Sequence, residues 1–260
     1  MLRSVRATRY VTPLREGGSL PGIVEADDLG LYVLKFHSAG QGPLALAAKI
    51  IAGEIGRLLG LPVPELVLIH VDEALGRNER DEEVRDLLCA SAGLNLGMDY
   101  LPGSIMFDPA AGDMADAEFA SLLVWFDAFV TNVDRTGRNP NLLCWHKKLY
   151  PIDHGAALYF HHNWQNIDAA AESPFSPIRD HVLLRWASRI EAAQQAAKSL
   201  LTTAALEGVL VLLPDAWLLP APGAEIPATK RAGYLSYLRH RLESSNGFVE
   251  EALRARANLI

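Results

Sequence analysis

Four side chains with oxygen atoms suited to metal binding stand close together in the middle of the sequence: Asp134, Asn139, Asn141 and Asp153. Asp134 opens a polar loop that follows an apolar stretch, and the two asparagines close that loop. The apolar runs 142–145 and 149–152 flank a short polar turn, a pattern that predicts a hairpin. Such a hairpin brings Asp153 back beside Asn141, and converging carboxylate and amide oxygens suit Mg²⁺.

A magnesium site of this kind is what phosphoryl transfer requires. The metal neutralises charge on the phosphate oxygens, a further carboxylate orients the attacking hydroxyl, and a lysine holds the phosphates that do not react. Lys35 is the candidate lysine, because it lies within the apolar run 32–36, where a charge needs a partner or a ligand. The sequence therefore predicts a site that binds a metal and a nucleotide.

Hydrophobic periodicity predicts a mixed first third of the chain and a mostly helical remainder. Two short apolar runs, 23–25 and 31–36, surround an Asp/Gly turn and predict a hairpin. Apolar residues recur with a helical period over 44–59, and Gly60 ends that helix. The other predicted elements are a strand over 64–71, a strand that runs into a crossover over 92–103, a polar solvated stretch over 78–85, and helices over 119–130, 178–201 and 229–256. Asp127, an acid among aromatic residues, is interpreted as a brace for the polar loop.

Composition limits the classes of function. The 260 residues are 50% hydrophobic and 21% charged, which is enough apolar surface for a folded core. A net charge of −7 argues against direct nucleic-acid binding, which needs a basic face. No apolar run reaches the roughly 20 residues of a membrane span, and two cysteines, Cys89 and Cys144, cannot make a disulfide framework. We therefore expect a cytoplasmic protein without membrane partners.

Three short phrases contain Asp134, Asn141 and Asp153: Asp134-Arg135, Asn141-Leu142-Leu143 and Ile152-Asp153-His154-Gly155. They resemble the catalytic and metal-binding segments of HipA-like kinases, distant relatives of the phosphoinositide kinases. Upstream, the stretches 10–21, 34–36, 40–43, 60–64 and 93–103 are similar to the compact HipA-like subgroup. The resemblance covers roughly residues 8 to 185 and implies an α+β, two-lobed protein-kinase-like fold. A small mixed N-lobe, which binds the nucleotide phosphates, would span 1–95, and a mainly helical C-lobe would span 96–260.

Carried over residue by residue, the resemblance makes Asp134 the catalytic-loop aspartate that positions the substrate hydroxyl. Asn141 and Asp153 would hold Mg²⁺. Asn139 is the alternative to Asn141 as the metal-binding asparagine. In lipid-kinase-like relatives this asparagine follows the catalytic aspartate by five residues, and that spacing selects Asn139. An apolar strand should follow the metal ligand, and this favours Asn141, since Leu142 begins that strand.

The resemblance also implies which residues contact ATP: Lys35, Gly17, Gly18, Ser19, Asp99 and Leu101. The lysine would contact the α- and β-phosphates, and the glycine-rich loop would cover the phosphates with its N–H groups. Asp99 and Leu101 would lie in the strand between the lobes, beside adenine. Glu54, on the inward face of the helix over 44–59, is the candidate partner of Lys35, whereas Lys49 stands where some relatives carry an acid.

The function that the resemblance implies is ATP- and Mg²⁺-dependent phosphorylation of a hydroxyl, that of a protein serine or threonine or of the enzyme itself. Alternatives are a catalytically silent nucleotide-binding regulatory module and a kinase of lipids or small-molecule alcohols. A metal-dependent hydrolase could use the same carboxylates, but it would not require Lys35 or the glycine-rich loops. The histidines match no zinc signature.

Overall fold

Two compact units make up the chain. The computed structural model describes residues 1–14, 20–77, 79–219 and 226–259. The first unit contains Met1–Ala47 and Pro64–Pro102, and the second contains Ala48–Val63 and Gly103–Ile260. One boundary between the units falls within helix α1 (Pro43–Leu58). The residue ranges of the units therefore differ from those of the expected lobes, 1–95 and 96–260. The lobe boundary stays a prediction.

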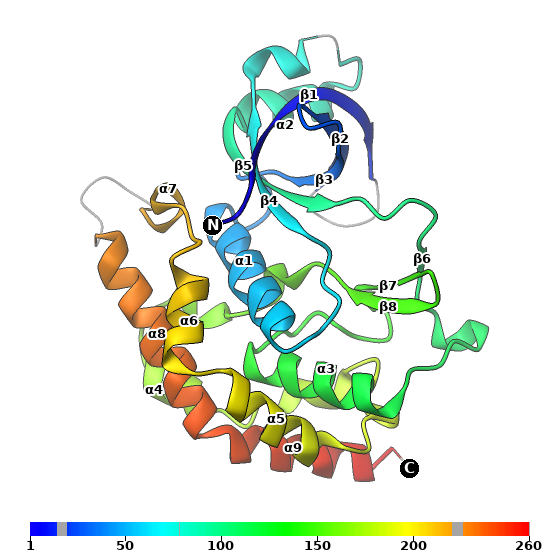
Figure 1. The fold of residues 1–260 in the computed structure, drawn as a ribbon, viewed down its shortest axis with the longest axis vertical. Coiled ribbons are helices and arrows are strands. Elements are labelled where there is room, and N and C mark those ends of the chain that lie inside the picture. The colour runs from blue at the N-terminus through cyan, green and yellow to red at the C-terminus, as the bar shows by residue number, and fades with distance from the viewer. Residues whose placement is uncertain (15–19, 78, 220–225, 260) are drawn as a thin grey trace. The chain divides into compact units, whose positions relative to one another are not determined.

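The first unit is built around a closed barrel with the strand order β1-β2-β3-β5-β4 (Figure 1). Its strands are β1 (Ser4–Pro13), β2 (Gly22–Ala26), β3 (Leu31–Lys35), β4 (Leu66–Val71) and β5 (Gly93–Asp99). The antiparallel pairing of β2 with β3 confirms the predicted hairpin, and β4 and β5 confirm the two predicted strands. Strand β1 was not predicted; it pairs in parallel with β4 and so closes the barrel.

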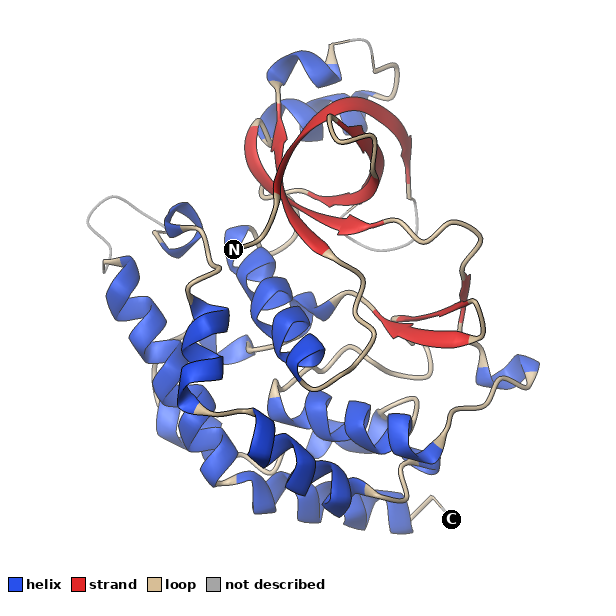
Figure 2. Cartoon of the chain, viewed as in Figure 1, coloured by secondary structure: helices blue, strands red, loops and turns tan. Residues whose placement is uncertain are grey.

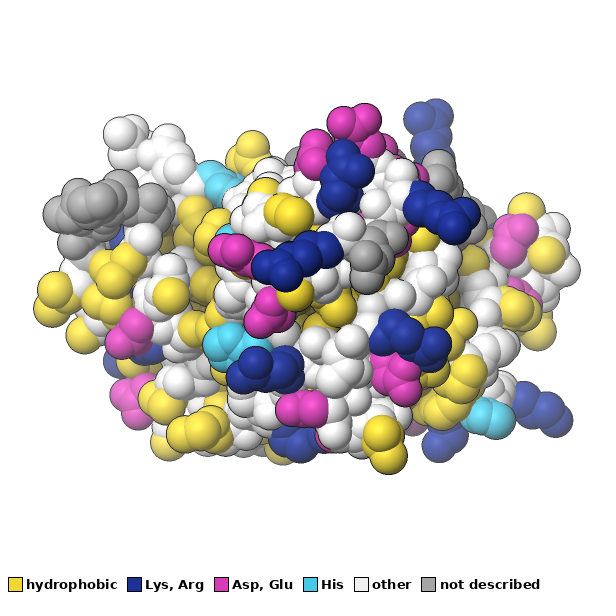
Figure 3. All heavy atoms as spheres, turned by 90° about the horizontal axis from the view of Figure 1, so that it is seen from above, with side chains coloured by type: hydrophobic (Ala, Val, Ile, Leu, Met, Phe, Trp, Pro, Cys, Tyr) yellow, Lys and Arg dark blue, Asp and Glu magenta, His cyan; other side chains and the backbone are white. Residues whose placement is uncertain are grey.

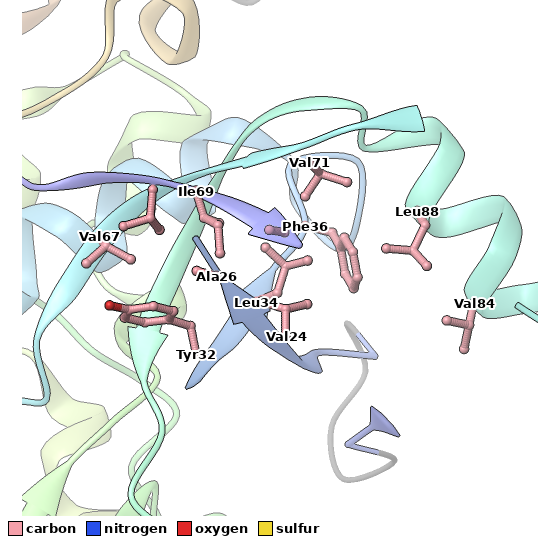
Figure 4. Close-up of a cluster of buried hydrophobic side chains, with 12 residues drawn as sticks. Val24, Ala26, Tyr32, Leu34, Phe36, Val67, Ile69, Val71, Val84 and Leu88 are labelled. Carbon is pink, nitrogen blue, oxygen red and sulfur yellow. The ribbon is translucent and has the colours of Figure 1, made fainter. Parts of the chain in front are cut away.

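Alternate side chains of these strands fill the barrel with a hydrophobic cluster (Figure 4). Val24, Leu34 and Val67 are fully excluded from solvent. Gly97 of β5 faces this cluster, and a Cβ atom there would stand 2.7 Å from Cγ2 of Val67. Glycine at this position therefore lets two strands of the barrel approach closely.

Helix α2 (Glu82–Ala90) adds Val84 and Leu88 to the same cluster. The carboxylate of Asp81 caps the start of the helix and accepts a hydrogen bond from the N–H of Glu83 at 3.1 Å. The prediction of a polar, solvated stretch over 78–85 is therefore wrong for Val84, which is buried, whereas Glu82 and Glu83 on the outer side of the helix are exposed as predicted.

Helices make up most of the second unit (Figure 2). They include α3 (Ala117–Phe129), α4 (Ile167–Glu172), α5 (Ile190–Leu200), α6 (Thr203–Leu210), α7 (Asp215–Leu218), α8 (Pro227–Glu243) and α9 (Ser245–Ala257). Helix α3 confirms the helix predicted over 119–130, and it packs against α5 and α9. A three-stranded antiparallel sheet of β6 (Ile105–Met106), β7 (Leu142–Trp145) and β8 (Lys148–Pro151) contains the predicted second hairpin.

The pattern over 178–201 predicted one amphipathic helix, and this is wrong for its first half. Short 3-10 helices occupy Ser176–Asp180 and Leu184–Trp186, and the α-helix begins only at Ile190. Between the 3-10 helices, the N–H of Val182 donates to the carbonyl of Arg135 at 3.1 Å, so contact with a distant loop replaces helical bonding. The helix predicted over 229–256 is present as α8 and α9, with a break at Ser244.

Two features of the structure concern the expectation that the chain binds neither membranes nor nucleic acid: the character of its helices and the charges on its surface. Within the described ranges, no helix has both the length and the apolar character needed to span a membrane. On the face shown in Figure 3, basic and acidic side chains are interspersed rather than gathered by sign. The expectations that the chain binds neither membranes nor nucleic acid stay predictions.

Candidate active site

Helix α3 leads into the loop that carries Asp134. The carbonyls of Ala128 and Phe129, in the last turn of α3 in the second unit, accept hydrogen bonds from the buried guanidinium of Arg241 on α8. The carbonyl of Val130 accepts another from the N–H of Leu158 at 2.8 Å. The loop therefore leaves α3 from a point that is held by two other segments.

Asp134 and the two candidate asparagines lie together in this loop. Oδ2 of Asp134 accepts a hydrogen bond from Nδ2 of Asn139 at 2.8 Å and a longer one from Nδ2 of Asn141 at 3.4 Å. The N–H of Asp134 donates to Oδ1 of Asn132 at 3.3 Å. Both asparagines thus share one carboxylate oxygen, and both remain candidates for the metal-binding role.

The hairpin of β7 and β8 brings Asp153 to the same place as Asn141. Leu142 pairs with Pro151, and the N–H of Ile152 donates to the carbonyl of Asn141 at 2.9 Å. Asn141 and Asp153 have positive φ angles of 45° and 50°, a conformation that Asn and Asp adopt more readily than most residues. The chain therefore turns sharply before β7 and after β8, at one end of the hairpin.

The carboxylate of Asp153 forms an ion pair with a lysine, a pairing that was not predicted. Nζ of Lys49, in the part of α1 that belongs to the second unit, lies 2.6 Å from Oδ1 of Asp153. Their side chains are 13% and 30% exposed, so water screens the pair only in part. The sequence contained a signal for this pair, because Lys49 stands between the apolar residues Ala48 and Ile50 of a predicted helix, where a charge needs a partner.

The lysine and the glutamate that were expected to pair with each other belong to different compact units. Lys35 is buried at the end of β3, opposite Leu96 of β5. Glu54 lies on α1, with Oε1 3.7 Å from Nε of Arg57. The expected pairing of Lys35 with Glu54 stays a prediction.

The remaining expected nucleotide contacts come from the first unit. Asp99 is the last residue of β5, where burial and the charge of Glu65 raise its pKa. Leu101 is buried two residues further on. Gly17, Gly18 and Ser19 lie outside the described residues. The contacts of these residues with a nucleotide stay predictions.

A buried ion pair lies directly behind the loop that carries Asp134. Nε of Arg135 donates to Oδ2 of Asp127 at 2.5 Å, and neither side chain is exposed. Nη1 of Arg135 also donates to the carbonyls of Asn141 and Ile152, at the end of the hairpin where Asp153 follows. Nδ2 of Asn132 donates to the other oxygen of Asp127 at 2.9 Å. Asp127 is therefore the brace that the sequence indicated, and Arg135 extends it to the hairpin.

Two buried histidines complete this network in their neutral form. Nδ1 of His181 accepts a hydrogen bond from the N–H of Leu183 at 3.0 Å, so Nε2 carries the proton and donates to Asp127 at 2.9 Å. Nδ1 of His154 accepts from Arg135 at 3.0 Å, because a guanidinium only donates. Burial lowers the pKa of His181, and burial with the charge of Arg135 lowers the pKa of His154 to about 3.

Asp127 stays ionised in this setting. Burial by itself would raise the pKa of its carboxyl group, but the charge of Arg135 and the hydrogen bond from His181 outweigh burial and hold that pKa well below its usual range. The network behind the loop thus contains one charged pair and two neutral rings.

The oxygen donors near the hairpin fit a hard divalent cation. Asp134 and Asp153 offer carboxylate oxygens, and Asn139 and Asn141 offer amide oxygens, the ligand types that Mg²⁺ prefers. Among the residues with described positions, no three His, Cys, Asp or Glu side chains form a cluster that could hold a metal ion. The set that fits magnesium therefore depends on an amide oxygen as well as on carboxylates.

Comparison with known proteins identifies the family. The sequence model of the HipA-like kinases matches residues 8–246. The chain belongs to the HipA-like kinase family. The resemblance of its motifs to that family is confirmed, and the protein is a kinase. No curated protein matches this HipA-like kinase in sequence.

Two solved kinases have a similar fold. The Helicobacter pylori proinflammatory kinase CtkA superposes with a TM-score of 0.54 at 10% identity, over 100% of this chain and 99% of its own. The Golgi casein kinase with Mn/ADP bound superposes with a TM-score of 0.53 at 12% identity, over 96% of this chain and 74% of its own. The HipA-like kinase therefore has the mixed α and β fold of these kinases.

Proposed function

We propose that this HipA-like kinase transfers the γ-phosphoryl group of ATP, bound with Mg²⁺, to the hydroxyl of a serine or threonine in a protein or in the kinase itself. The observation that carries the proposal is the position of Asp134, Asn141 and Asp153 at one end of the β7–β8 hairpin. Membership of the family supports ATP as the donor. The Golgi casein kinase, which has a similar fold, was solved with Mn and ADP, which supports a divalent metal and an adenine nucleotide.

Each residue has a distinct part in this proposal. The carboxylate of Asp134 is exposed and accepts both asparagine hydrogen bonds on Oδ2, so we expect Oδ1 to face the substrate hydroxyl and orient it. Asp153, with Asn141 or Asn139, would hold the metal, and Lys35 would hold the phosphates that do not react. Mg²⁺ would neutralise the charge of the phosphate oxygens.

The ion pair of Asp127 and Arg135 would keep this geometry fixed during the reaction. Arg135 bonds to the carbonyls of Asn141 and Ile152, so the two turns that present the metal ligands are tied to one guanidinium. A preorganised site of this kind spends little free energy on reorganisation when the phosphoryl group moves.

The metal role is tested with Asp153→Asn. In the wild-type kinase, ATP should raise the melting temperature more with Mg²⁺ than without it, and the substitution should abolish this difference because it removes a charged ligand. Asp180→Asn is the matched control, since Asp180 is a 63% exposed aspartate of the same unit. A metal-dependent shift that persists in Asp153→Asn would contradict the proposal.

The catalytic role is tested with Asp134→Asn. Binding of ATP and metal should be retained, whereas transfer of radiolabelled phosphate should fall by about 10²-fold to 10⁴-fold, because the hydroxyl loses the base that orients it. Transfer at the wild-type rate would refute the role of Asp134. Label in the kinase itself or in added protein supports the proposed acceptor. Label only in lipid vesicles or small alcohols, or no transfer by a wild-type chain that binds ATP, overturns it.

A further inference from the structure

The pair of Lys49 and Asp153 places a positive charge on the carboxylate that the proposed metal would also use. Nζ of Lys49 lies 2.6 Å from Oδ1 of Asp153, within hydrogen-bond distance for an ammonium group and a carboxylate. The lysine side chain is only 13% exposed, so most of its length is packed against protein. Both residues lie in the second unit, and the pair joins α1 to the turn after β8.

Gly155 leaves the space in which this ammonium group lies. A Cβ atom at position 155 would stand 2.1 Å from Nζ of Lys49 and 3.4 Å from Oδ1 of Asp153. The side chain of His154 does not compete for this space, because it is buried and its Nδ1 accepts a hydrogen bond from Arg135. The turn of Asp153, His154 and Gly155 is therefore shaped to receive a lysine.

A divalent cation and an ammonium group that are bound to the same carboxylate lie close enough to repel each other. Lys49 already neutralises Asp153, so a free metal ion gains less there than at an unpaired carboxylate. A nucleotide changes this balance, because its phosphates bring negative charge that can pair with the displaced ammonium group. The charges therefore favour the entry of metal and nucleotide together over the entry of metal alone.

We propose that Lys49 competes with the metal for the carboxylate of Asp153. This competition makes metal binding depend on the nucleotide. The inference rests on the proposed function, since it takes Asp153 as a metal ligand. It adds a coupling between the two ligands of the site, and such a coupling is reciprocal: metal strengthens nucleotide binding by the same factor.

The test measures binding of Mn²⁺, a paramagnetic substitute for Mg²⁺, by the loss of its free electron paramagnetic resonance signal, with and without ADP. Lys49→Met should bind Mn²⁺ without ADP roughly tenfold more tightly than wild type, a difference of about 1.4 kcal/mol. ADP should then strengthen Mn²⁺ binding less in the variant than in wild type. Unchanged or weaker binding of Mn²⁺ alone by the variant would overturn the proposal, because Lys49 would then position Asp153 rather than compete for it.

Two further variants make the test specific. Lys147→Met removes an exposed lysine from the turn between β7 and β8, and it should leave Mn²⁺ affinity within twofold of wild type. Gly155→Ala keeps both charges, but its methyl group would displace the flexible end of Lys49, so it should also tighten Mn²⁺ binding, by a smaller factor. Equal tightening by Lys147→Met, or no tightening by Gly155→Ala, would contradict a local competition.

The same titration separates this inference from the proposed function. Asp153→Asn should lose Mn²⁺ binding in the presence of ADP whatever Lys49 does. If it binds Mn²⁺ as well as wild type, the metal role of Asp153 fails and the inference fails with it. If Asp153→Asn loses binding and Lys49→Met shows no gain, only the inference fails.

Discussion

Two buried arginines lie near the end of helix α3, and they differ in what surrounds them. Arg135 and Arg241 are 1% and 0% exposed. Arg135 bonds to a carboxylate, that of Asp127, as well as to carbonyls and a histidine ring. Arg241 bonds to main-chain carbonyls, among them those of Ala128 and Ala171, and its guanidinium stacks 4.7 Å from the ring of Phe248.

The difference separates a group that positions the site from one that holds helices together. The carbonyls bonded to Arg135 belong to Asn141 and Ile152, beside the candidate metal ligands. Those bonded to Arg241 belong to α3, to α4 and to Ser173 directly after α4. We therefore expect variants of Arg135 to affect metal binding and stability together, and variants of Arg241 to affect stability alone.

The largest effect is expected from Asp127→Leu, because it leaves the charge of Arg135 buried without its carboxylate. Removing one partner of a buried pair costs about 3–5 kcal/mol, which urea unfolding would measure. The double variant Asp127→Leu with Arg135→Met removes both charges and should recover part of that loss, since well-packed apolar residues can replace a buried pair. Its Mn²⁺ affinity with ADP should stay low, because the carbonyls of Asn141 and Ile152 lose their common donor. Losses that simply add in the double variant would show that the pair is not coupled.

A smaller effect is expected from Arg241→Met, which sharpens the comparison with Arg135→Met. The Arg241 variant leaves several carbonyls without donors but no uncompensated charge, so we expect a loss of about 2 kcal/mol in the free energy of unfolding. Its Mn²⁺ affinity with ADP, per folded molecule, should match wild type, whereas Arg135→Met should weaken that affinity at least tenfold. Equal effects of both variants on metal binding would remove the distinction between the two arginines.

The parts of this kinase that the sequence predicted are those with a local signal. The two hairpins and helices α1 and α3 follow from runs of apolar residues with a clear period and from turn residues between them. Strand β1 had such a signal too: Val5 and Ala7 are buried and alternate with exposed Arg6 and Thr8. Its pairing with β4 was not predictable locally, because the partner strand lies about 60 residues further on.

The parts that were not predicted depend on contacts between distant segments. His181 reaches Asp127 across 54 residues, and this contact is one reason why the pattern over 178–201 does not form a single helix. The partner of Asp153 is a lysine 104 residues away. Asp153 was predicted as a metal ligand and Lys49 stood out as a lysine where some relatives carry an acid, but only the fold brings the two together.

The last effect is a change in the pH dependence of stability at little cost near neutral pH, and it should distinguish the surroundings of Arg135 from those of Arg241. His181 and His154 are buried and neutral near Arg135, with pKa values lowered below that of an exposed histidine, to about 3 for His154. Below pH ~6.5 the unfolded chain binds protons at these rings more readily than the folded chain does. The free energy of unfolding is therefore highest above that pH and decreases as the pH falls. One such ring contributes a slope of at most about 1.4 kcal/mol per pH unit to the free energy of unfolding.

The free energy of unfolding of His181→Gln should therefore depend less steeply on pH between 6.5 and 4, as measured by urea unfolding at each pH. Arg241→Met should keep the wild-type slope at a lower stability. If Arg241→Met reduced the slope and His181→Gln left it unchanged, the acid-sensitive contact would lie near Arg241 and not near Arg135.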